Sequence, residues 1–393
     1  MDEEYDIIIV GGGPAGTLTA KMCAAKGLKV LVLEKKPEIG APKRCAEGIG
    51  HLDLLRAGYT GKERFIAQTI DGAIVYVPNG APIELPKQPG GGYILERKVF
   101  DKFLAYDAAK AGAKIYTKAE VFDLLWSGGK IAGAKVLYNG EQKDIYSKII
   151  IAADGVESKI PRIAGLPSRN TPRTIESGYQ YEMANIDIKD PHKIHTYLGN
   201  EIAPRGYIWI FPKGSHIANV GIGINGSDGK TAKYYLDKWI SSKPGIKKGS
   251  IIEENSGGIP IGGFLESMTT DNFLTIGDAA HQVNPIHGGG LAETSFSAEI
   301  AAKVIIDAIK LKDTSNKTLD RYNKLWWEKR GNNLKKTEKI LHVLEKVKDS
   351  DINLAQSSFH GQDILDLTGG KTHKLIKILI NNPKLATLIK YLK

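Results

Sequence analysis

Cysteine is scarce in this sequence, whose 393 residues include only Cys23 and Cys45. Two cysteines without metal-ligand spacing exclude a disulfide framework and a cysteine-bound metal cluster, and they fit a reducing compartment. Long hydrophobic runs are also missing, since none approaches the roughly 18 residues of a membrane-spanning helix. The opening residues, MDEEYDIIIVGGG, lack the basic region of a signal peptide. We therefore expect a cytoplasmic protein that does not cross a membrane.

Acidic residues are outnumbered: Lys and Arg total 54 against 44 Asp and Glu, which gives a formal net charge of +10. An excess of this size fits an anionic ligand, an anionic membrane surface or nucleic acid, but it also occurs as plain surface solvation. No motif of the usual nucleic-acid modules is present, which disfavours nucleic acid. The length and the 42% hydrophobic content suit a protein of two domains.

The amino end has the pattern of a dinucleotide-binding unit. The apolar run YDIIIV predicts a buried parallel strand, and Gly11, Gly13 and Gly16 follow it in GxGxxG spacing. A helical stretch at 14–26 and a second strand ending at Glu34 complete the unit. In such a unit the first glycine makes the tight turn, the second admits the pyrophosphate, the third lets helix and strand pack closely, and the acid binds the ribose.

A second glycine-rich segment, GDAAHQVNPIHGGG, occupies residues 277–290. A helix predicted over 291–310 follows at once, so the three final glycines stand at its amino end. Unpaired N–H groups and a partial positive charge at a helix amino end suit an anionic ligand. Glycines let the backbone approach that ligand closely, and Pro285 fixes the turn before them.

Four segments together resemble the FAD-binding family that includes glutathione reductase and p-hydroxybenzoate hydroxylase. In the first, small residues continue after the GxGxxG pattern at Ala20 and Gly27. The others are GYILERKVFDKFL with Arg97, IIIAADGVESKIPRIAG with Asp154, and FLTIGDAAHQVNPIHGGG with Asp278. The resemblance implies FAD, an arginine near the flavin, and an aspartate on the ribityl chain. It also implies that the glycine-opened helix points at the N1 and C2=O edge of the flavin ring.

The resemblance assigns the FAD contacts to these motifs and to the segment that follows the second strand. It implies no metal. The residues concerned are Gly11, Gly13, Ala15, Gly16, Glu34, Lys35, Arg44, Cys45, Arg97, Asp154, Gly155, Asp278, Pro285, Gly288, Gly289 and Gly290.

Strand and helix patterns divide the chain into interleaved parts. Residues 119–154 predict a meander with turns at 127–129 and 139–140, and YQYEMANIDI and HIANVGIGI predict strands of a mixed sheet. We therefore predict an α/β fold, with a Rossmann-like FAD-binding domain, a mixed β-sheet substrate domain and carboxyl-terminal helices. The predicted boundaries are 1–65, 98–175 and 266–310 for the FAD domain, 66–97 and 176–265 for the substrate domain, and 311–393 for the helical region.

Two further segments, PEIGAPKRCAEGI and APRGYIWIFPKGSHIANVGIG, resemble the geranylgeranyl reductase family. The similarity is greatest to the archaeal members that saturate the prenyl chains of ether lipids. Their signature YxWxFP, followed by GxG, is matched in the second segment, and RCxEG is matched in the first. The resemblance implies reduction of isolated C=C bonds in geranylgeranyl groups. The substrate contacts that it implies are Tyr207, Trp209, Phe211, Pro212 and Gly221.

The chemistry of this reduction requires hydride and proton together. An isolated alkene has no carbonyl to polarise it, so hydride from flavin N5 must be matched by protonation of the other carbon. Aromatic faces stabilise the developing positive charge by roughly 0.5–2 kcal/mol, and an apolar wall excludes water. Tyr207, Trp209 and Phe211 alternate in a predicted strand and therefore share one face. Ordinary core packing is the alternative role for each.

A proton donor is also needed, and Cys45 is the first candidate because its segment is expected near the flavin. His287 and His281 are rivals, and packing or flavin binding is the alternative role for all three. The predicted catalytic residues are Cys45, Tyr207, Trp209 and His287.

The nearest competing function is that of a flavin-dependent monooxygenase or halogenase on the same fold. Halogenases carry a WxWxIP element and a reactive lysine, whereas this sequence has YIWIFP at 207–212, a departure toward the reductases. A non-catalytic FAD protein that recruits an anionic partner or membrane is a second alternative. The glycine-rich face aimed at the flavin ring argues against it.

The implied partners are a geranylgeranyl ether lipid and an external electron donor. No second GxGxxG unit for NADPH is present, so ferredoxin, a reduced quinone-like donor and transient NAD(P)H contact stay open. The basic segment 371–393 predicts either an interfacial helix on the inner membrane face or a helical cap over the substrate domain, and we favour the cap. Its apolar residues are Leu375, Ile378, Leu379, Leu385, Leu388, Ile389 and Leu392.

Overall fold

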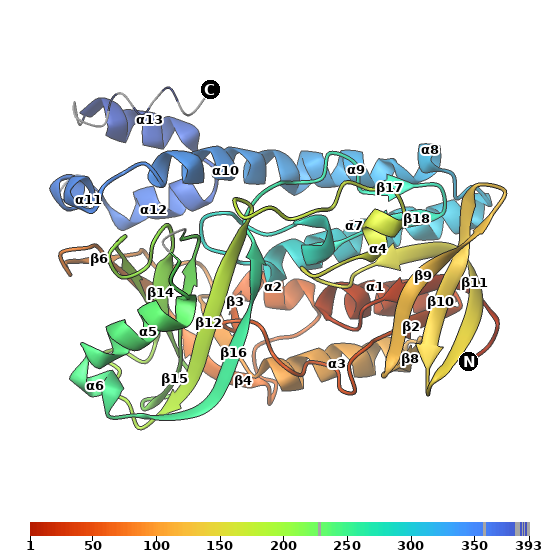
Figure 1. Ribbon diagram of the computed structural model, residues 1–393, viewed down its shortest axis with the longest axis horizontal. Coiled ribbons are helices and arrows are strands. Elements are labelled where there is room, and N and C mark those ends of the chain that lie inside the picture. Colours follow the sequence, from red (N-terminus) through yellow and green to blue (C-terminus); the bar gives the residue numbers. More distant parts are fainter. Residues whose placement is uncertain (227–228, 357–358, 382–385, 387, 389, 391–393) are drawn as a thin grey trace.

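The computed structural model describes residues 1–226, 229–356, 359–381, 386, 388 and 390. Two large sheets occupy the two ends of the long axis, and the carboxyl-terminal helices, drawn in blue, run along one side (Figure 1). The predicted α/β fold is confirmed, with a Rossmann-like unit, a separate mixed sheet and terminal helices.

The first sheet has eight strands and contains the dinucleotide-binding unit. In spatial order its strands are β17 (Thr269–Thr270), β18 (Phe273–Thr275), β11 (Glu141–Ala152), β1 (Glu4–Val10), β2 (Val30–Leu33) and β8 (Lys114–Tyr116), with β10 (Lys130–Tyr138) and β9 (Ala119–Ser127) attached to β11. Strand β1 lies parallel to both β11 and β2, and hydrophobic clusters cover both faces of the sheet. Burial on both faces explains the continuous apolar runs of β1 and β2.

Strands β9, β10 and β11 form the predicted meander. Strand β10 pairs antiparallel with both neighbours, and the turns fall at 128–129, inside the predicted 127–129, and at 139–140 as predicted. The far half of β11 then pairs with β1, so one long strand joins the meander to the parallel part of the sheet.

The second sheet is mixed and has seven strands. In spatial order they are β16 (Ser250–Pro260), β12 (Ile175–Ala184), β15 (Ile217–Ile224), β14 (Tyr207–Pro212), β13 (Lys193–Leu198), β5 (Gly72–Tyr76) and β6 (Pro82–Glu84). A third, small sheet consists of β3 (Gly48–Gly50), β7 (Gly92–Leu95) and β4 (Ile66–Ile70). Segment 66–97 therefore contributes strands to two different sheets, and the three-part domain division stays a prediction.

Three helices pack together beside the first sheet: α1 (Pro14–Ala24), α3 (Arg97–Lys110) and α7 (Leu291–Leu311). Helix α1 starts with proline, whose missing N–H costs nothing in the first turn, and it ends two residues before the predicted Lys26. Cys23 is completely buried in this region and acts as a core residue. Smaller helices are α2 (His51–Arg56), α4 (Ile160–Ile163) and a 3-10 turn at Gly277–Ala280.

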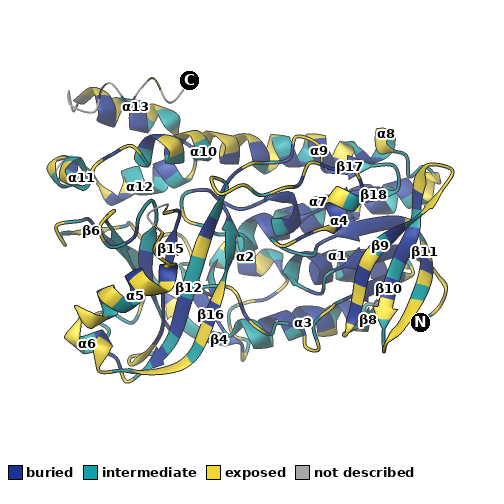
Figure 2. Cartoon of the chain, in the orientation of Figure 1, coloured by how far each residue is buried: buried dark blue, intermediate teal, exposed yellow. Residues whose placement is uncertain are grey.

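Helices α5 (Ala232–Ser241) and α6 (Pro244–Lys247) are associated with the second sheet, and their outer surfaces are exposed (Figure 2). The carboxyl-terminal helices are α8 (Asn316–Leu319), α9 (Arg321–Trp326), a π-helical turn (Trp327–Gly331), α10 (Asn332–Leu344), α11 (Asp349–Ala355), α12 (Gly361–Thr368) and α13 (Thr372–Asn381). Among the described residues, no helix combines the length and apolar character needed to span a membrane.

Helix α13 packs its apolar side inward. Leu375, Ile378 and Leu379 are buried in a cluster with residues of α10 and α12, and Leu388 packs against it. Leu385, Ile389 and Leu392 lie outside the described residues. The apolar side of the described part of 371–393 thus packs against other helices of the protein, as the predicted cap requires.

Candidate active site

The glycine turn after β1 has the geometry that a pyrophosphate cradle needs. Gly11 has a φ of +107°, and a Cβ there would lie 2.3 Å from the carbonyl oxygen of Ala153. A Cβ on Gly16 would lie 2.1 Å from the carbonyl oxygen of Gly11, so helix and strand touch at this point. Gly13 faces open space, with no atom within 4 Å of such a Cβ. These contacts are compatible with the roles that the spacing predicts for the three glycines, and the pyrophosphate contact itself stays a prediction.

Glu34 stands at the rim of this turn. Its carboxylate accepts hydrogen bonds of 2.9 Å from the backbone N–H groups of Gly12 and Lys36. These bonds hold the carboxylate beside the glycine turn, where a ribose can reach it. Ala15, at the start of α1, lines the adjoining cavity, whereas the Lys35 side chain is exposed.

Asp154 organises the loop that follows β11. Its carboxylate accepts a hydrogen bond of 2.6 Å from the Ser158 hydroxyl and one of 3.3 Å from the Lys159 N–H. Burial raises the pKa of Asp154. Its neighbour Gly155 has a φ of +79° and lines the cavity. Asp154 therefore positions the loop, and Gly155 lies at the cavity surface, while contact of either residue with FAD stays a prediction.

Asp278 lies at the amino end of α7. A Cβ on Gly290 would come within 3.1 Å of its Oδ1, and the carboxyl group lines the cavity. Burial raises the pKa of Asp278, with a smaller opposing effect from Arg97. Within the described part of the chain the carboxyl group has no hydrogen-bond partner, which leaves it free for a ligand. An unpaired, half-buried acceptor beside a helix amino end fits a polyol such as the FAD ribityl chain.

The loop between Asp278 and α7 is held by Asn284. Its side-chain oxygen accepts the N–H of Ile286 at 3.0 Å, and its N–H bonds to the carbonyl of Gly289 at 3.1 Å. Pro285 is buried inside this turn, and Gly288 has a φ of +65°. The turn directs all three glycines, 288–290, toward the cavity.

A cavity of about 910 Å³ joins these loops to the second sheet and the carboxyl-terminal helices. Its wall at the far end comes from β5, β13, α11, α12 and α13, and it is predominantly apolar. Leu365, Leu375 and Leu379 line this end. The cap formed by the carboxyl-terminal helices is thus part of the cavity wall.

The aromatic residues of β14 share one face, as predicted, and all three line the cavity. The ring centroids of Tyr207 and Trp209 are 5.8 Å apart, and those of Trp209 and Phe211 are 6.5 Å apart. Gly221 on β15 makes room for the Trp209 indole, because a Cβ there would lie 2.4 Å from the ring. Pro212 ends the strand and is buried.

The segment 44–47 crosses the cavity wall between the two large sheets. The Sγ of Cys45 accepts the Glu47 N–H at 3.2 Å, and burial raises the pKa of the thiol, against the opposing charge of Arg97. Arg97 makes two hydrogen bonds to Asp101, of 2.7 and 2.9 Å. Arg44 pairs with the exposed carboxylate of Glu157 at 2.7 Å. Because its pKa is raised, the Cys45 thiol stays protonated at neutral pH.

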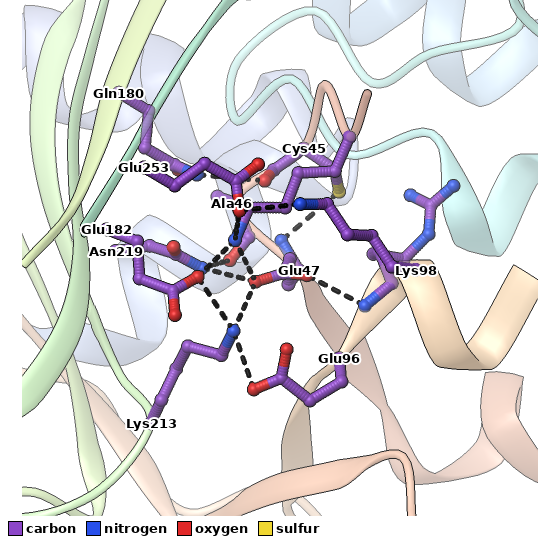
Figure 3. A network of polar contacts seen from close by, with 12 residues as sticks. Cys45, Ala46, Glu47, Glu96, Lys98, Gln180, Glu182, Lys213, Asn219 and Glu253 are labelled. Carbon is purple, nitrogen blue, oxygen red and sulfur yellow. Dashed lines mark hydrogen bonds and ion pairs between the residues drawn. The ribbon is translucent and has the colours of Figure 1, made fainter. Parts of the chain in front are cut away.

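A buried charge network fixes this segment (Figure 3). Glu47 is completely buried, and its carboxylate accepts the Arg97 N–H at 2.7 Å, the Asn219 amide at 2.7 Å and the Lys213 ammonium at 3.1 Å. Lys213 also contacts Glu96 at 2.7 Å and Glu182 at 3.0 Å. The three carboxylates thus converge on one ammonium group. Removing any buried member leaves its partners with uncompensated charge.

The two candidate histidines lie in different surroundings. His287 lines the cavity and is exposed there, and desolvation by the surrounding protein lowers its pKa. Its Nδ1 accepts the Gly289 N–H at 3.1 Å, so the neutral ring carries its proton on Nε2. His281 is 2% exposed, bonds to the Gly263 carbonyl at 2.8 Å, and is not among the described residues that line the cavity.

Sequence reasoning missed two polar residues of the cavity wall, Glu176 and Gln180. Both belong to β12 and point to the same face of the second sheet. The sequence pattern predicted the strand but not that this face lines the cavity. Gln180 bonds both Trp209 and the segment of Cys45, and Glu176 has no such partner among the described residues. The available signal was the placement of Glu176, Gln180 and Glu182 at even-numbered positions of one strand, because residues two apart in a strand share one face.

Comparison with known proteins agrees with this geometry. Residues 6–189 match the family model described as FAD dependent oxidoreductase, residues 174–259 match Geranylgeranyl reductase catalytic domain, and residues 232–359 match Lycopene cyclase protein. The chain is similar to the digeranylgeranylglycerophospholipid reductase of Methanocella arvoryzae, with 39% identity over 98% of each chain. It is 44% identical to that of Thermoplasma acidophilum over 82% of this chain and 83% of the relative.

Solved structures show the same relationship. A geranylgeranyl bacteriochlorophyll reductase-like protein from Thermoplasma acidophilum superposes with a TM-score of 0.89 at 36% identity and covers 100% of both chains. A myxobacterial chondrochloren halogenase reaches 0.71 at 19% identity over 85% of this chain and 82% of its own, which is a likeness of fold alone.

The glycine cradle, the free acceptor at α7 and the matching family model define an FAD-dependent oxidoreductase. The similarity over nearly the full length of the curated relatives identifies a narrower family within that class. The chain belongs to the digeranylgeranylglycerophospholipid reductase family.

Proposed function

We propose that this protein saturates C=C double bonds of geranylgeranyl chains in an ether lipid of the archaeal type. The observation that carries the proposal is the apolar cavity of about 910 Å³, which joins the cofactor loops to the aromatic face of β14. This volume is near the upper end of ligand pockets, about 300–1,000 Å³. The names of the relatives, digeranylgeranylglycerophospholipid reductases, support the same substrate class.

Reduced FAD supplies a hydride when bound, and the side chains of the cavity wall hold the alkene in a water-free, charge-stabilising environment. The apolar side chains exclude water from the alkene, and Tyr207, Trp209 and Phe211 present their rings to the developing positive charge. The motif residues hold the cofactor through the glycine turn, Glu34, Asp278 and the glycines before α7. Arg97, paired with Asp101, brings positive charge to the same region.

Cys45 is the proton donor that the sequence predicts. Its thiol lines the cavity and remains protonated, as a donor requires. His287 is neutral at physiological pH, so it is a weaker acid than an imidazolium and suits hydrogen bonding better than proton transfer. Replacing Cys45 with Ala or Ser tests this role: an unchanged rate in the fully reduced enzyme removes Cys45 from the mechanism.

A peripheral contact with the membrane and an external electron donor complete the proposal. The net charge of +10 favours an anionic membrane surface, and ferredoxin, a quinone-like donor and NAD(P)H are the candidate donors. Binding to anionic liposomes that weakens with salt and is lost on truncation after Gly370 would support the membrane contact. Equal binding by the truncated protein would place the contact elsewhere.

The direct experiment is a single turnover without oxygen. The purified protein is reduced, a geranylgeranyl ether lipid is added, and the product mass is measured, with two hydrogens gained for each saturated bond. Substrate-dependent consumption of O2 without saturation would instead support a monooxygenase or halogenase.

A further inference from the structure

A buried carboxyl group on the cavity wall takes no part in the chemistry described so far. Glu176, on β12, is 5% exposed and faces the cavity together with Gly178 and Gln180. Its carboxyl group makes no hydrogen bond or ion pair with any residue that the structure describes. Burying a carboxylate without a partner is costly, so the surroundings favour the neutral acid.

The neighbours of Glu176 explain why it lacks a counter-ion. The positive charge of Arg205 acts on Glu176, but its guanidinium makes two hydrogen bonds, of 3.1 and 2.5 Å, to one oxygen of Glu345. The third ionisable neighbour, Tyr207, is uncharged because burial raises its pKa. Burial, and secondly the charge of Glu345, raise the pKa of Glu176 to about 8, against a smaller opposing effect of Arg205.

A glycine on the neighbouring strand leaves room for the Glu176 carboxyl group. A Cβ on Gly223 of β15 would lie 2.9 Å from Oε2 of Glu176, so a larger residue there would displace it. Glu176 is paired across β12 and β16 with Ile259, and a Cβ on Gly288 would lie 3.2 Å from that isoleucine. The Tyr207 hydroxyl bonds to the His287 carbonyl at 2.7 Å. This part of the sheet therefore faces the glycine loop before α7.

We propose that Glu176, rather than the predicted Cys45, is the acid that delivers the proton to the alkene; this rests on the C=C reduction in the proposed function. The π electron pair of the C=C bond forms a new C–H bond with the Glu176 proton, and the O–H bond breaks to leave the carboxylate. The other alkene carbon accepts the hydride of the reduced cofactor. Two C–H bonds are formed, FAD is left oxidised, and solvent water returns the proton to Glu176. Arg205 lies close enough to stabilise the transient carboxylate.

Glu176 and Cys45 lie at different places along the cavity. Gln180, which bonds the Cys45 carbonyl, is four residues from Glu176 on the same strand, or about 13 Å at the usual rise of a strand. The two acids are therefore distinguishable by mutation. A carboxyl group also differs from a thiol in its vibrational spectrum, so its protonation can be observed directly.

The test compares Glu176→Gln with Glu254→Gln, which makes the same chemical change at an exposed position of β16. Each holoenzyme is reduced anaerobically and mixed with a geranylgeranyl ether lipid. We expect FAD content and reduction by dithionite to be unchanged in both, and reoxidation by the lipid to be at least 100-fold slower only in Glu176→Gln. Infrared difference spectra should show a protonated carboxyl band at pH 7 in the wild type and the control that is absent in Glu176→Gln.

A third variant tests the proton donor by its pH profile. Glu345→Gln removes the neighbouring negative charge and frees Arg205, so the alkaline decline of the reoxidation rate should move to lower pH. Wild-type rates in Glu176→Gln overturn the proposal, as does a carboxyl band that is missing at pH 7, or complete loss of reoxidation in Cys45→Ala while Glu176→Gln is unaffected. A wild-type enzyme that the lipid never reoxidises contradicts the proposed function itself.

Discussion

The indole Nε1 of Trp209 donates a hydrogen bond of 2.9 Å to Oε1 of Gln180, across the intervening strand β15. The bond is possible because the indole lies over Gly221, where a Cβ would be 2.4 Å from the ring. The amide of Gln180 donates in turn to the Cys45 carbonyl at 3.1 Å. One buried amide therefore joins the aromatic face to the segment that crosses the cavity wall.

Replacing Gln180 should weaken this connection. In Gln180→Leu the buried indole N–H of Trp209 loses its acceptor, which costs about 1–3 kcal/mol of unfolding free energy. We expect slower turnover with FAD content unchanged, measured by denaturant unfolding and flavin absorbance. Gln180→Glu is the control, because it keeps an acceptor for the indole. Equal losses of stability and turnover in both variants would show that the hydrogen bond to the Cys45 carbonyl, and not the one from the Trp209 indole, causes the effect.

Gly13 and Gly16 should respond differently to alanine. A Cβ fits at Gly13 in the free protein but occupies the space of the pyrophosphate, so Gly13→Ala should weaken FAD binding at least tenfold, or about 1.4 kcal/mol. Gly16→Ala forces a Cβ to 2.1 Å from the Gly11 carbonyl, and it should destabilise the apoprotein by about 1–3 kcal/mol. FAD titration and denaturant unfolding separate the two effects. Identical behaviour of the variants would refute the assigned roles.

Asp278→Asn should separate cofactor binding from stability. Its carboxyl group has no partner within the described residues, so the apoprotein should unfold at the same denaturant concentration or a higher one. FAD should bind about 10- to 100-fold more weakly, because a hydrogen bond to a charged group is worth about 1.5–3 kcal/mol. Unchanged FAD affinity with a less stable apoprotein would assign Asp278 a structural role instead.

Leu375 belongs both to the core of the cap and to the cavity wall. Leu375→Ala should destabilise the protein by about 2–4 kcal/mol and raise the KM for the lipid, since it removes apolar contact area from both the core and the cavity wall. Ile380, 60% exposed on the same helix, is the control, and Ile380→Ala should change neither quantity. Thermal unfolding and steady-state kinetics provide the measurements. A normal KM in Leu375→Ala would mean that the lipid does not reach the cap.

The buried acid Glu176 should also affect stability in a pH-dependent way. Its folded-state pKa of about 8 lies above the ordinary value of 4.5, so the native state holds a proton that the unfolded chain has released. Wild-type stability should therefore decline between about pH 4.5 and 8, by up to about 1.4 kcal/mol per pH unit for this group. Glu176→Gln removes this contribution, so the variant gains stability relative to the wild type as the pH rises. Parallel curves from pH 5 to 9 would contradict the raised pKa.

Local sequence determined the cofactor end of the protein. The GxGxxG turn, the two strands beside it and the meander could be predicted because each depends on residues close together in the chain. The spacing of Gly11, Gly13 and Gly16 fixes which glycine touches backbone and which faces open space. The alternation of Tyr207, Trp209 and Phe211 likewise placed all three on one face without knowledge of the fold.

Tertiary structure decided the rest of the site. Glu176 and Gln180 carried no motif, and they meet the cavity only because β12 folds against segments more than a hundred residues away. The sequence placed Leu375 in a helical cap, but only the packed structure puts it in the cavity wall. Tertiary structure also decided which charges are paired: Arg205 pairs with Glu345, and Glu176 has no partner among the described residues. The sequence supplies the ionisable groups, but their protonation depends on burial and on neighbouring charges, which exist only once distant segments have packed together.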